Sequence, residues 1–370
     1  MPIMRFVSPR LSDPWMLGSL EVPNRVLLAP LAGIGNWFVR LQAKRYGAGM
    51  AVSEMVSSHA IYHRNERTCN EMLRIHPDEQ EPVRSAPGGA DAPAGVVSIQ
   101  LFGEDPDVMR AAAARVRAAG ADAIDINMGC PVPKVQKTGA GAALLSDPDL
   151  AVALARAARE GGEGLPVTVK LRSGRRPGET SGFELAHRLV SEAGVAAIGF
   201  HPRSAVVHHK GVPDYELAAR LVESLDAPVI LTGGLSDAEH VHDAFRETGA
   251  AAVMLARGAL GNPWLFEQLL GSRSQGPSRG EVLGELDWTI DRAVEHLGEP
   301  RATRYLRKFY PWYVQQLELD RQTAKELQAA LQAAETLSEA RNRLAILLRS
   351  LTPPGGETPR VQAGFVISPT

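Results

Sequence analysis

The sequence predicts a TIM (β/α)8 barrel followed by a small all-helical C-terminal domain. Eight short segments of strand length recur between residues 26 and 256, and each is apolar almost throughout, as parallel strands covered on both faces are. Helical patterns separate most of these segments, and strand signals vanish after residue 270. The predicted strands are residues 26–30, 51–55, 96–100, 123–127, 167–171, 197–201, 229–232 and 252–256.

The segments between the predicted strands carry helix start and stop signals. An Ala-rich stretch begins at Asp107 as its capping residue and stops at Gly120, and Pro148 falls in the first turn of another helix. Segments 214–217 and 236–240 begin in a similar way. The strand starts fall 23 to 45 residues apart, which fits βα units with occasional insertions. A doubly wound open sheet is the alternative, but eight near-equal units favour closure.

Composition changes beyond the predicted barrel, which we place at residues 1–270. Residues 271–280 contain no apolar side chain and are predicted to form a linker. Helical periodicity dominates residues 281–351, which we interpret as a small helical domain. The segment 352–370 begins with several Pro and Gly residues and is predicted to be a disordered tail.

The overall composition excludes several classes of protein. The 370 residues include 40 Lys and Arg against 42 Asp and Glu, a balance that argues against a strongly basic nucleic-acid binder but allows a local basic face. The two cysteines, Cys69 and Cys130, exclude a disulfide scaffold and a four-cysteine zinc module. No apolar run approaches the roughly 18 residues of a membrane span, and no export signal is evident. We expect a cytoplasmic, monomeric protein without a metal.

Polar residues stand at or just after the ends of successive predicted strands. In a TIM barrel these ends and the loops that follow them build the active site. Any one of these residues could have an ordinary structural role, but polar groups at so many strand ends together favour a functional site. The set is Glu54, Gln100, Asn127, Cys130, Lys170, Arg172, His201 and Arg257.

The segment 125–131, Asp-Ile-Asn-Met-Gly-Cys-Pro, is the most informative. A strand ends at Asn127, Gly129 lets the backbone turn, and Cys130 is then expected over the barrel mouth. Its thiol could be a nucleophile, a metal ligand or an acid. A metal is disfavoured because no second cysteine or paired histidine lies at ligand spacing. A hydrolytic nucleophile needs a base, for which His201 is the only strand-end candidate, so proton donation to carbon is the remaining role.

Two glycine-containing segments follow the seventh and eighth predicted strands. They are Thr232-Gly233-Gly234 and Ala256-Arg257-Gly258. Simple turns are one interpretation, but barrels commonly bind phosphate with backbone N–H groups at these two loops. The guanidinium of Arg257 can add a fork of donors to the same group. The sequence therefore favours a phosphorylated ligand, without naming a reaction.

Several motifs together resemble the tRNA-dihydrouridine synthases, and the bacterial B-type enzymes most. The similarity covers roughly residues 15–270 and continues more faintly into the helical domain. The strongest match is the Asn-Met-Gly-Cys-Pro loop with the Gly-Ala-Gly segment after it. The motifs lie at residues 29–33, 53–55, 125–131, 134–135, 139–145, 169–172, 201–203, 262–266 and 307–313.

The resemblance implies an FMN-dependent barrel that reduces the C5–C6 double bond of tRNA uridines, with NADPH or NADH supplying electrons. Asn127 and Arg172 would bind the uracil, and Cys130 would donate a proton to C5 while reduced flavin passes hydride to C6. The residues implied to hold FMN are Pro30, Leu31 and Ala32 against the flavin, Gln100 and Lys170 at its ring edge, His201 on the flavin, and Thr232, Gly233, Gly234, Ala256 and Arg257 around its phosphate.

The helical domain is the candidate for tRNA phosphate contacts, because a uridine must be flipped out of its stack to enter the barrel mouth. Residues 301–350 contain nine basic and five acidic side chains, a local excess of four positive charges. Arg304, Arg307 and Lys308 are spaced to share one helical face. A solvated charged face is the alternative interpretation.

The chain departs from the family pattern at several positions. Thr232-Gly233-Gly234 stands where the family usually has Asn-Gly-Asp, Ala256 replaces a Gly, and Phe309 replaces a His. A basic residue is missing at Ala205. Two alternatives stay open on these grounds: an FMN barrel that reduces a small enone or pyrimidine, and a flavin-free tRNA-binding module.

Overall fold

The computed structural model describes residues 9–82 and 94–351. The predicted tail, 352–370, lies outside the described residues. The described residues divide into two compact units, one formed by residues 9–82, 94–259 and 263–274 and the other by 260–262 and 275–351. α10 (Arg279–Leu297) begins within the predicted linker and includes its last two residues, 279 and 280.

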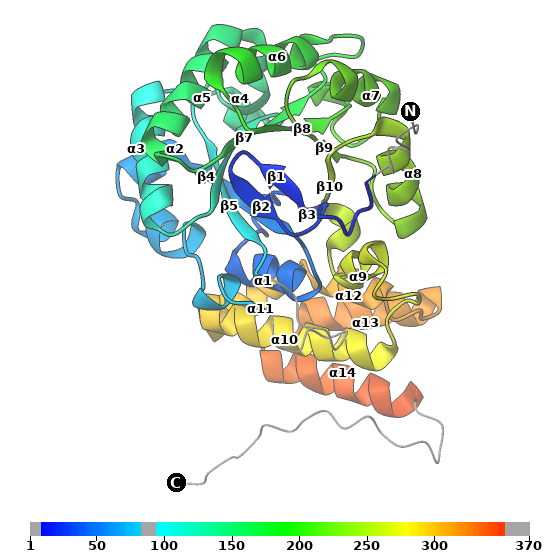
Figure 1. The fold of residues 1–370 in the computed structure, drawn as a ribbon. Coiled ribbons are helices and arrows are strands. Elements are labelled where there is room, and N and C mark those ends of the chain that lie inside the picture. The colour runs from blue at the N-terminus through cyan, green and yellow to red at the C-terminus, as the bar shows by residue number, and fades with distance from the viewer. Residues whose placement is uncertain (1–8, 83–93, 352–370) are drawn as a thin grey trace. The chain divides into compact units, whose positions relative to one another are not determined.

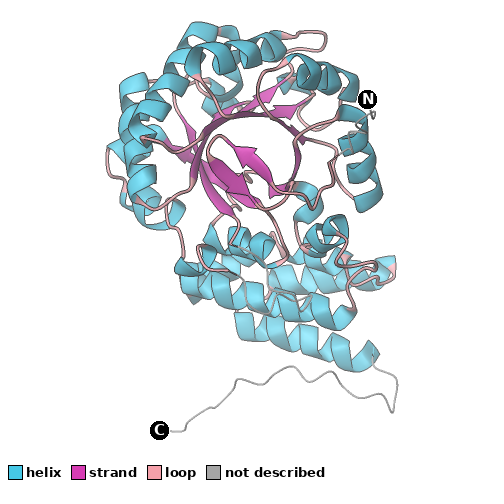
Figure 2. Ribbon diagram, viewed as in Figure 1, coloured by secondary structure: helices cyan, strands magenta, loops and turns pink. Residues whose placement is uncertain are grey.

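The first unit is a closed barrel of eight parallel strands in the order β10-β3-β4-β5-β6-β7-β8-β9. Figures 1 and 2 show the strands as a central ring with helices around it. The predicted barrel is confirmed, and pairing of β10 with β3 excludes the open sheet. The strands are β3 (Val26–Leu28), β4 (Met50–Ser57), β5 (Val96–Phe102), β6 (Ala123–Met128), β7 (Val167–Arg172), β8 (Ala197–His201), β9 (Val229–Thr232) and β10 (Ala252–Leu255).

Asp side chains begin four of the barrel helices. Asp147, Asp214 and Asp237 each accept a backbone N–H of the first turn, at three of the helix starts that the sequence predicts. The cap of α3 is Asp105 and not Asp107, because Pro106 occupies the first helical position. The helices of this unit are α1 (Trp37–Arg45), α2 (Ser58–Tyr62), α3 (Pro106–Ala118), α4 (Pro133–Gln136), α5 (Pro148–Gly162), α6 (Ser181–Ala193), α7 (Tyr215–Ser224), α8 (Ala238–Thr248) and α9 (Trp264–Leu270).

An antiparallel hairpin that the sequence did not predict precedes the barrel strands. It consists of β1 (Trp15–Leu17) and β2 (Leu20–Val22). Its buried side chains join one apolar cluster with residues near the starts of the barrel strands, among them Ala123, Ala197 and Ala252. The hairpin therefore fills the N-terminal end of the barrel, which leaves the C-terminal end for a ligand.

The second unit is helical and has a core of its own. Its helices are α10, α11 (Glu299–Leu306), α12 (Tyr310–Gln315), α13 (Arg321–Ala333) and α14 (Leu337–Leu351). Ile290, Leu306, Tyr310 and Leu331 are almost completely buried. In the part of the chain that the structure describes, no helix combines the length and the apolar character that a membrane crossing needs.

Candidate active site

Four buried polar side chains form a hydrogen-bonded chain across the barrel interior. Strand register places Gln100 beside Asp125, and Asp125 beside Thr168. Gln100 Nε2 donates to Asp125 Oδ2 at 2.5 Å, Thr168 Oγ1 donates to Asp125 Oδ1, and Asn127 Nδ2 donates to Gln100 Oε1 at 2.9 Å. Burial raises the pKa of Asp125 to about 6, although these hydrogen bonds and the charge of Lys170 oppose the shift.

The loop that carries Cys130 is fixed on both sides. Asn127 Oδ1 accepts the backbone N–H groups of Gly129 at 3.2 Å and Cys130 at 2.9 Å. The carbonyl of Cys130 accepts the N–H of Ala142 at 3.0 Å. Gly141 is needed there, because it has φ +64° and a Cβ would lie 2.9 Å from that carbonyl oxygen. Cys130 itself is half-buried, so it is held in place and keeps some exposure to solvent.

The guanidinium of Arg172 connects two loops at the C-terminal end of the barrel. It donates to the carbonyls of Gly129 at 3.1 Å, Ser204 at 3.2 Å and His208 at 2.7 Å. Burial, followed by the charge of Arg203, lowers its pKa to about 10, which leaves it cationic at neutral pH. These contacts join the loop after β6 to the loop after β8, so Arg172 supports the site's shape.

His201 is buried among cations. Burial contributes most, followed by Lys170, Arg172 and Arg203, and together they hold the pKa of His201 far below its usual value. Arg203 Nη1 lies 3.3 Å from His201 Nε2. Because a guanidinium only donates, Nε2 is the acceptor and the ring proton is on Nδ1. Burial and Arg172 also lower the pKa of Lys170 to about 8.

Arg203 has a buried donor that nothing in the described part of the chain accepts. Its Nη2 donates to the carbonyl of Gly211 at 2.7 Å, whereas its Nε has no partner. Further positive charge, that of Arg257, lies nearby. Burial and then the charge of Arg257 lower the pKa of His209 to about 4, and the charge of Arg203 contributes to the same shift. A buried guanidinium N–H without an acceptor, beside further cationic groups, fits an anion such as a phosphate.

Two glycines after β9 give this region its shape. Gly233 and Gly234 have φ of +99° and +84°. A Cβ on Gly233 would lie 2.3 Å from His201 Cδ2, and a Cβ on Gly234 would lie 2.9 Å from Tyr215 Oη. Tyr215 Oη donates to the carbonyl of Gly233 at 3.0 Å. The backbone can take this form only without side chains at both positions, which leaves a cradle of the kind that binds phosphate.

The remaining residues of the predicted phosphate site differ in exposure. Thr232 is buried, Ala256 is half-buried, and Arg257 is exposed at the start of a short 3-10 helix, Arg257–Ala259. Thr232 is therefore positioned to contribute through its backbone, whereas the side chain of Arg257 can reach a ligand.

The loop after β3 carries the residues predicted to contact a flavin. Pro30 is half-buried, Leu31 is buried and Ala32 is exposed. The N–H of Gly35 donates to the carbonyl of Leu31 at 2.7 Å, and the N–H of Glu54 donates to the carbonyl of Gly35 at 2.9 Å. The loop is thereby attached to β4.

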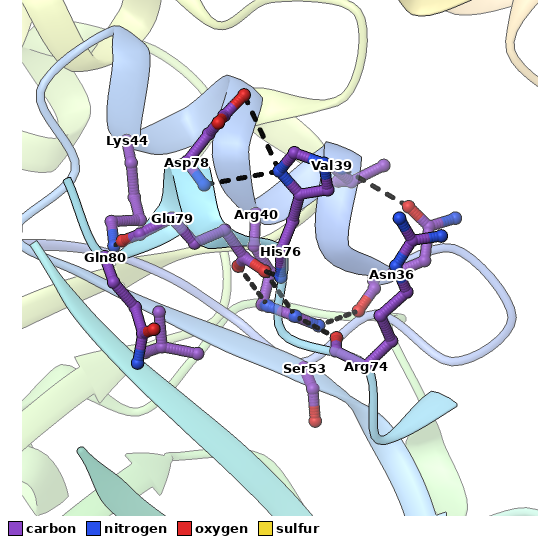
Figure 3. A network of polar contacts seen from close by, with 12 residues as sticks. Asn36, Val39, Arg40, Lys44, Ser53, Arg74, His76, Asp78, Glu79 and Gln80 are labelled. Carbon is purple, nitrogen blue, oxygen red and sulfur yellow. Dashed lines mark hydrogen bonds and ion pairs between the residues drawn. The ribbon is translucent and has the colours of Figure 1, made fainter. Parts of the chain in front are cut away.

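A buried ion pair lies behind this loop (Figure 3). Arg40 donates to both carboxylate oxygens of Glu79, at 2.7 and 2.9 Å, and both side chains are fully buried. Arg40 also donates to the carbonyls of Gly35 at 3.4 Å and Arg74 at 2.9 Å. The amine of Lys44 donates to the backbone carbonyl of Glu79. The pair therefore connects the loop after β3 with the segment before β5.

The three basic residues predicted in the helical unit are all exposed. The expectation that they share one helical face is wrong, because α11 ends at Leu306 and only Arg304 lies within it. Arg307 and Lys308 lie in the turn that follows. Pro311 explains the break, since its ring excludes the helical carbonyl contact with Arg307.

Comparison with known sequences identifies the family. Residues 27–350 match the family described as "Dihydrouridine synthase (Dus)". The chain is 33% identical over 326 residues to tRNA-dihydrouridine synthase B of Yersinia pestis, covering 87% of this chain and 96% of that protein. It is 31% identical over 347 residues to the protein of the same name from Xanthomonas campestris pv. campestris, covering 91% and 98%. The chain belongs to the dihydrouridine synthase family.

Solved structures support the fold of this dihydrouridine synthase family member. Morphinone reductase is 19% identical with a TM-score of 0.50, over 75% of this chain and 94% of that chain. A 2-naphthoyl-CoA reductase complex is 13% identical with a TM-score of 0.53, over 71% and 52%. Identities this low show the barrel fold alone.

The site of this dihydrouridine synthase family member fits the cofactor that the resemblance implies. FMN carries a phosphate, and the unpartnered Nε of Arg203 beside Gly233 and Gly234 offers what a phosphate needs. Sequence reasoning did not single out Arg203, although it belongs to the His-Pro-Arg motif. It also did not assign a role to Asp125 or Thr168. For Asp125 a signal was available, because it is a charged residue inside an otherwise apolar strand.

Replacing Gly233 with Ala should weaken flavin binding by about tenfold or more, because the methyl group must displace the His201 ring and strain the backbone. Gly178→Ala is a matched control, since Gly178 has φ +83° and open space around its Cβ. Titration of apoprotein with FMN measures both variants. Equal affinities would place the phosphate elsewhere.

Proposed function

We propose that this chain reduces the C5–C6 double bond of uridines in tRNA, using bound FMN and an NADPH or NADH electron donor. The single observation that carries the proposal is the Cys130 loop, which Asn127 fixes at the same end of the barrel as the cationic, glycine-lined cradle. The family match and the tRNA-dihydrouridine synthase B relatives support the choice of substrate. The proposal includes a monomeric enzyme in the cytoplasm, where tRNA is available.

The residues at the strand ends would contact different parts of FMN. The loop at Pro30, Leu31 and Ala32 would contact the flavin, with Gln100 and Lys170 at its ring edge. His201 would lie on the flavin as a neutral ring, since its pKa is held low. The residues that would hold the phosphate are Arg203, Thr232, Gly233, Gly234, Ala256 and Arg257.

Reduction of a polarised C=C bond needs a hydride at one carbon and a proton at the other. The hydride at C6 would come from FMN, if it is bound and reduced. Cys130 would transfer its thiol proton to C5, and the resulting thiolate would regain a proton from solvent before the next turnover. Asn127 would orient the uracil, and Arg172 would hold the two loops around it.

Incubating the protein with NADPH and tRNA that lacks dihydrouridine tests this function. We expect dihydrouridine among the nucleosides after digestion, and an absorbance of bound flavin in the purified protein. Flavin without dihydrouridine would support the alternative of a small-molecule reductase. Absence of flavin would support the flavin-free tRNA-binding module.

Charge removal at Arg304, Arg307 and Lys308 should weaken tRNA binding and reduce its salt dependence. Three lost phosphate contacts would flatten the slope of log K against log salt by about 2 to 3, depending on whether the contacts lie in paired or single strands. A variant with Gln at all three positions can be compared with the parent by filter binding at several salt concentrations. Arg110→Gln is a control, because Arg110 is already paired with Asp107 and Glu160 on the barrel surface. An unchanged slope would remove these three residues from the tRNA site.

A further inference from the structure

The hydrogen-bonded row of Asp125, Gln100 and Asn127 has a fixed donor-to-acceptor direction, because the groups at its two ends can only accept or only donate. The carboxylate of Asp125 only accepts hydrogen bonds, so Gln100 turns its NH2 group toward it. The backbone N–H groups of Gly129 and Cys130 only donate, so Asn127 turns its carbonyl oxygen toward them. The two amides then meet as Asn127 Nδ2 and Gln100 Oε1, the one pairing that both ends permit.

This direction decides what Asn127 can offer to a ligand. Its Oδ1 already accepts two N–H groups, which uses both lone pairs. Its Nδ2 gives one hydrogen to Gln100 and the other to the weak acceptor Met55 Sδ at 3.9 Å, which a stronger acceptor on a ligand can replace. A molecule that reaches the amide of Asn127 is therefore met by an N–H donor.

We propose that Asp125 is a positioning residue, which acts through Gln100 to set Asn127 as a hydrogen-bond donor toward the bound base and as the anchor of the Cys130 loop. Asp125 is 2% exposed and is enclosed by Gln100 and Thr168, so its influence on a ligand passes through its neighbours. Where it concerns the base, the inference rests on the proposed function. An N–H at Asn127 favours a ring carbonyl, which uracil has at two positions, and disfavours the exocyclic amino group of cytosine.

Exchanging the two acidic and amide residues tests the direction of the chain at constant charge. In Asn127→Asp alone, the new carboxylate faces Gln100 Oε1, so two acceptors lie against each other. If the Gln100 amide flips, its NH2 group donates to the new carboxylate at position 127 but its Oε1 then faces the carboxylate of Asp125. In Asp125→Asn with Asn127→Asp, the donor and acceptor roles along the whole row of side chains can reverse. The new amide at position 125 donates to Gln100 Oε1, Gln100 Nε2 donates to the new carboxylate at 127, and that carboxylate still accepts the loop N–H groups.

The reactivity of the Cys130 thiol reports on the loop without flavin or tRNA. The variants are made in a Cys69→Ser background, so that iodoacetamide labels one cysteine. We expect Asn127→Asp to change the labelling rate by roughly tenfold and to lower the melting temperature, and we expect the exchange variant to recover most of both. Both variants place the same carboxylate beside the thiol, so its direct effect cancels between them. Adding Gln100→Leu should abolish the recovery, because Gln100 is the link.

Two single variants of Asp125 complete the design. Asp125→Asn keeps an oxygen for Gln100 and should stay close to the parent, whereas Asp125→Leu removes the acceptor of Gln100 and should shift both the labelling rate and the melting temperature away from the parent. An exchange variant no better than Asn127→Asp in labelling and melting would overturn the proposal, and so would equal behaviour of Asp125→Asn and Asp125→Leu. If the exchange variant recovers but the parent protein forms no dihydrouridine, the proposed function is wrong and the positioning role of Asp125 is still supported.

Discussion

Replacing Cys130 with Ala should reduce uridine reduction by about 10²- to 10⁴-fold, the usual contribution of a positioned general acid. The other titratable groups near the site are poorly suited to replace it. His201 is neutral, and its Nε2 faces Arg203. Lys170 has its pKa lowered to about 8, but the resemblance assigns its amine to the flavin edge. The measurement is the rate at which tRNA reoxidises reduced enzyme in a single turnover, which isolates the chemical step.

Binding measurements separate a chemical role from a structural one. Cys130→Ala should keep FMN and tRNA affinity, because the loop is held by backbone groups and Asn127 and not by the thiol. Cys69→Ala is the matched control and should retain full turnover. Loss of FMN from Cys130→Ala, or an unchanged single-turnover rate, would contradict the assignment of Cys130 as the acid.

The barrel could be predicted because each of its strands is buried on both faces and is therefore a continuous apolar run. The hairpin could not be predicted because β1 and β2 have only three residues each, too few to form an apolar run or to show alternation. Strand-end residues such as Gln100 and Lys170 could be predicted as a group, since all parallel strands of a barrel end at one edge.

The interactions within the site could not be predicted, because they depend on register and side-chain direction. Gln100 and Asp125 are 25 positions apart in sequence, and only the pairing of β5 with β6 sets them side by side. The unpartnered Nε of Arg203 is likewise visible only once its surroundings are known. In the helical unit, the spacing of three basic residues suggested one face, and Pro311 ended the helix before the face was complete.

Replacing Glu79 with Ala should destabilise the protein by about 3–5 kcal/mol, the usual cost of leaving a buried charge unpaired. Arg40 and Glu79 have no exposed side-chain surface, and Glu79 also accepts the N–H of His76 at 2.9 Å. Lys44 is buried as well, with its pKa lowered to about 8 mainly by burial, and the charge of Glu79 opposes that shift. Without Glu79, two buried cations lose their nearest counter-charge.

This arrangement predicts an asymmetry between the two partners. Arg40→Met leaves Glu79 with Lys44 nearby, so it should cost less than Glu79→Ala, and Arg40→Met combined with Glu79→Leu should recover part of the loss by removing both charges. Urea denaturation gives the free energy of unfolding for each variant, with exposed Glu81→Gln as the control. Arg40 also contacts the carbonyl of Gly35, so we expect the Glu79 variant to bind FMN more weakly where it remains folded. Equal costs for the two single variants would mean that Lys44 does not share the charge of Glu79.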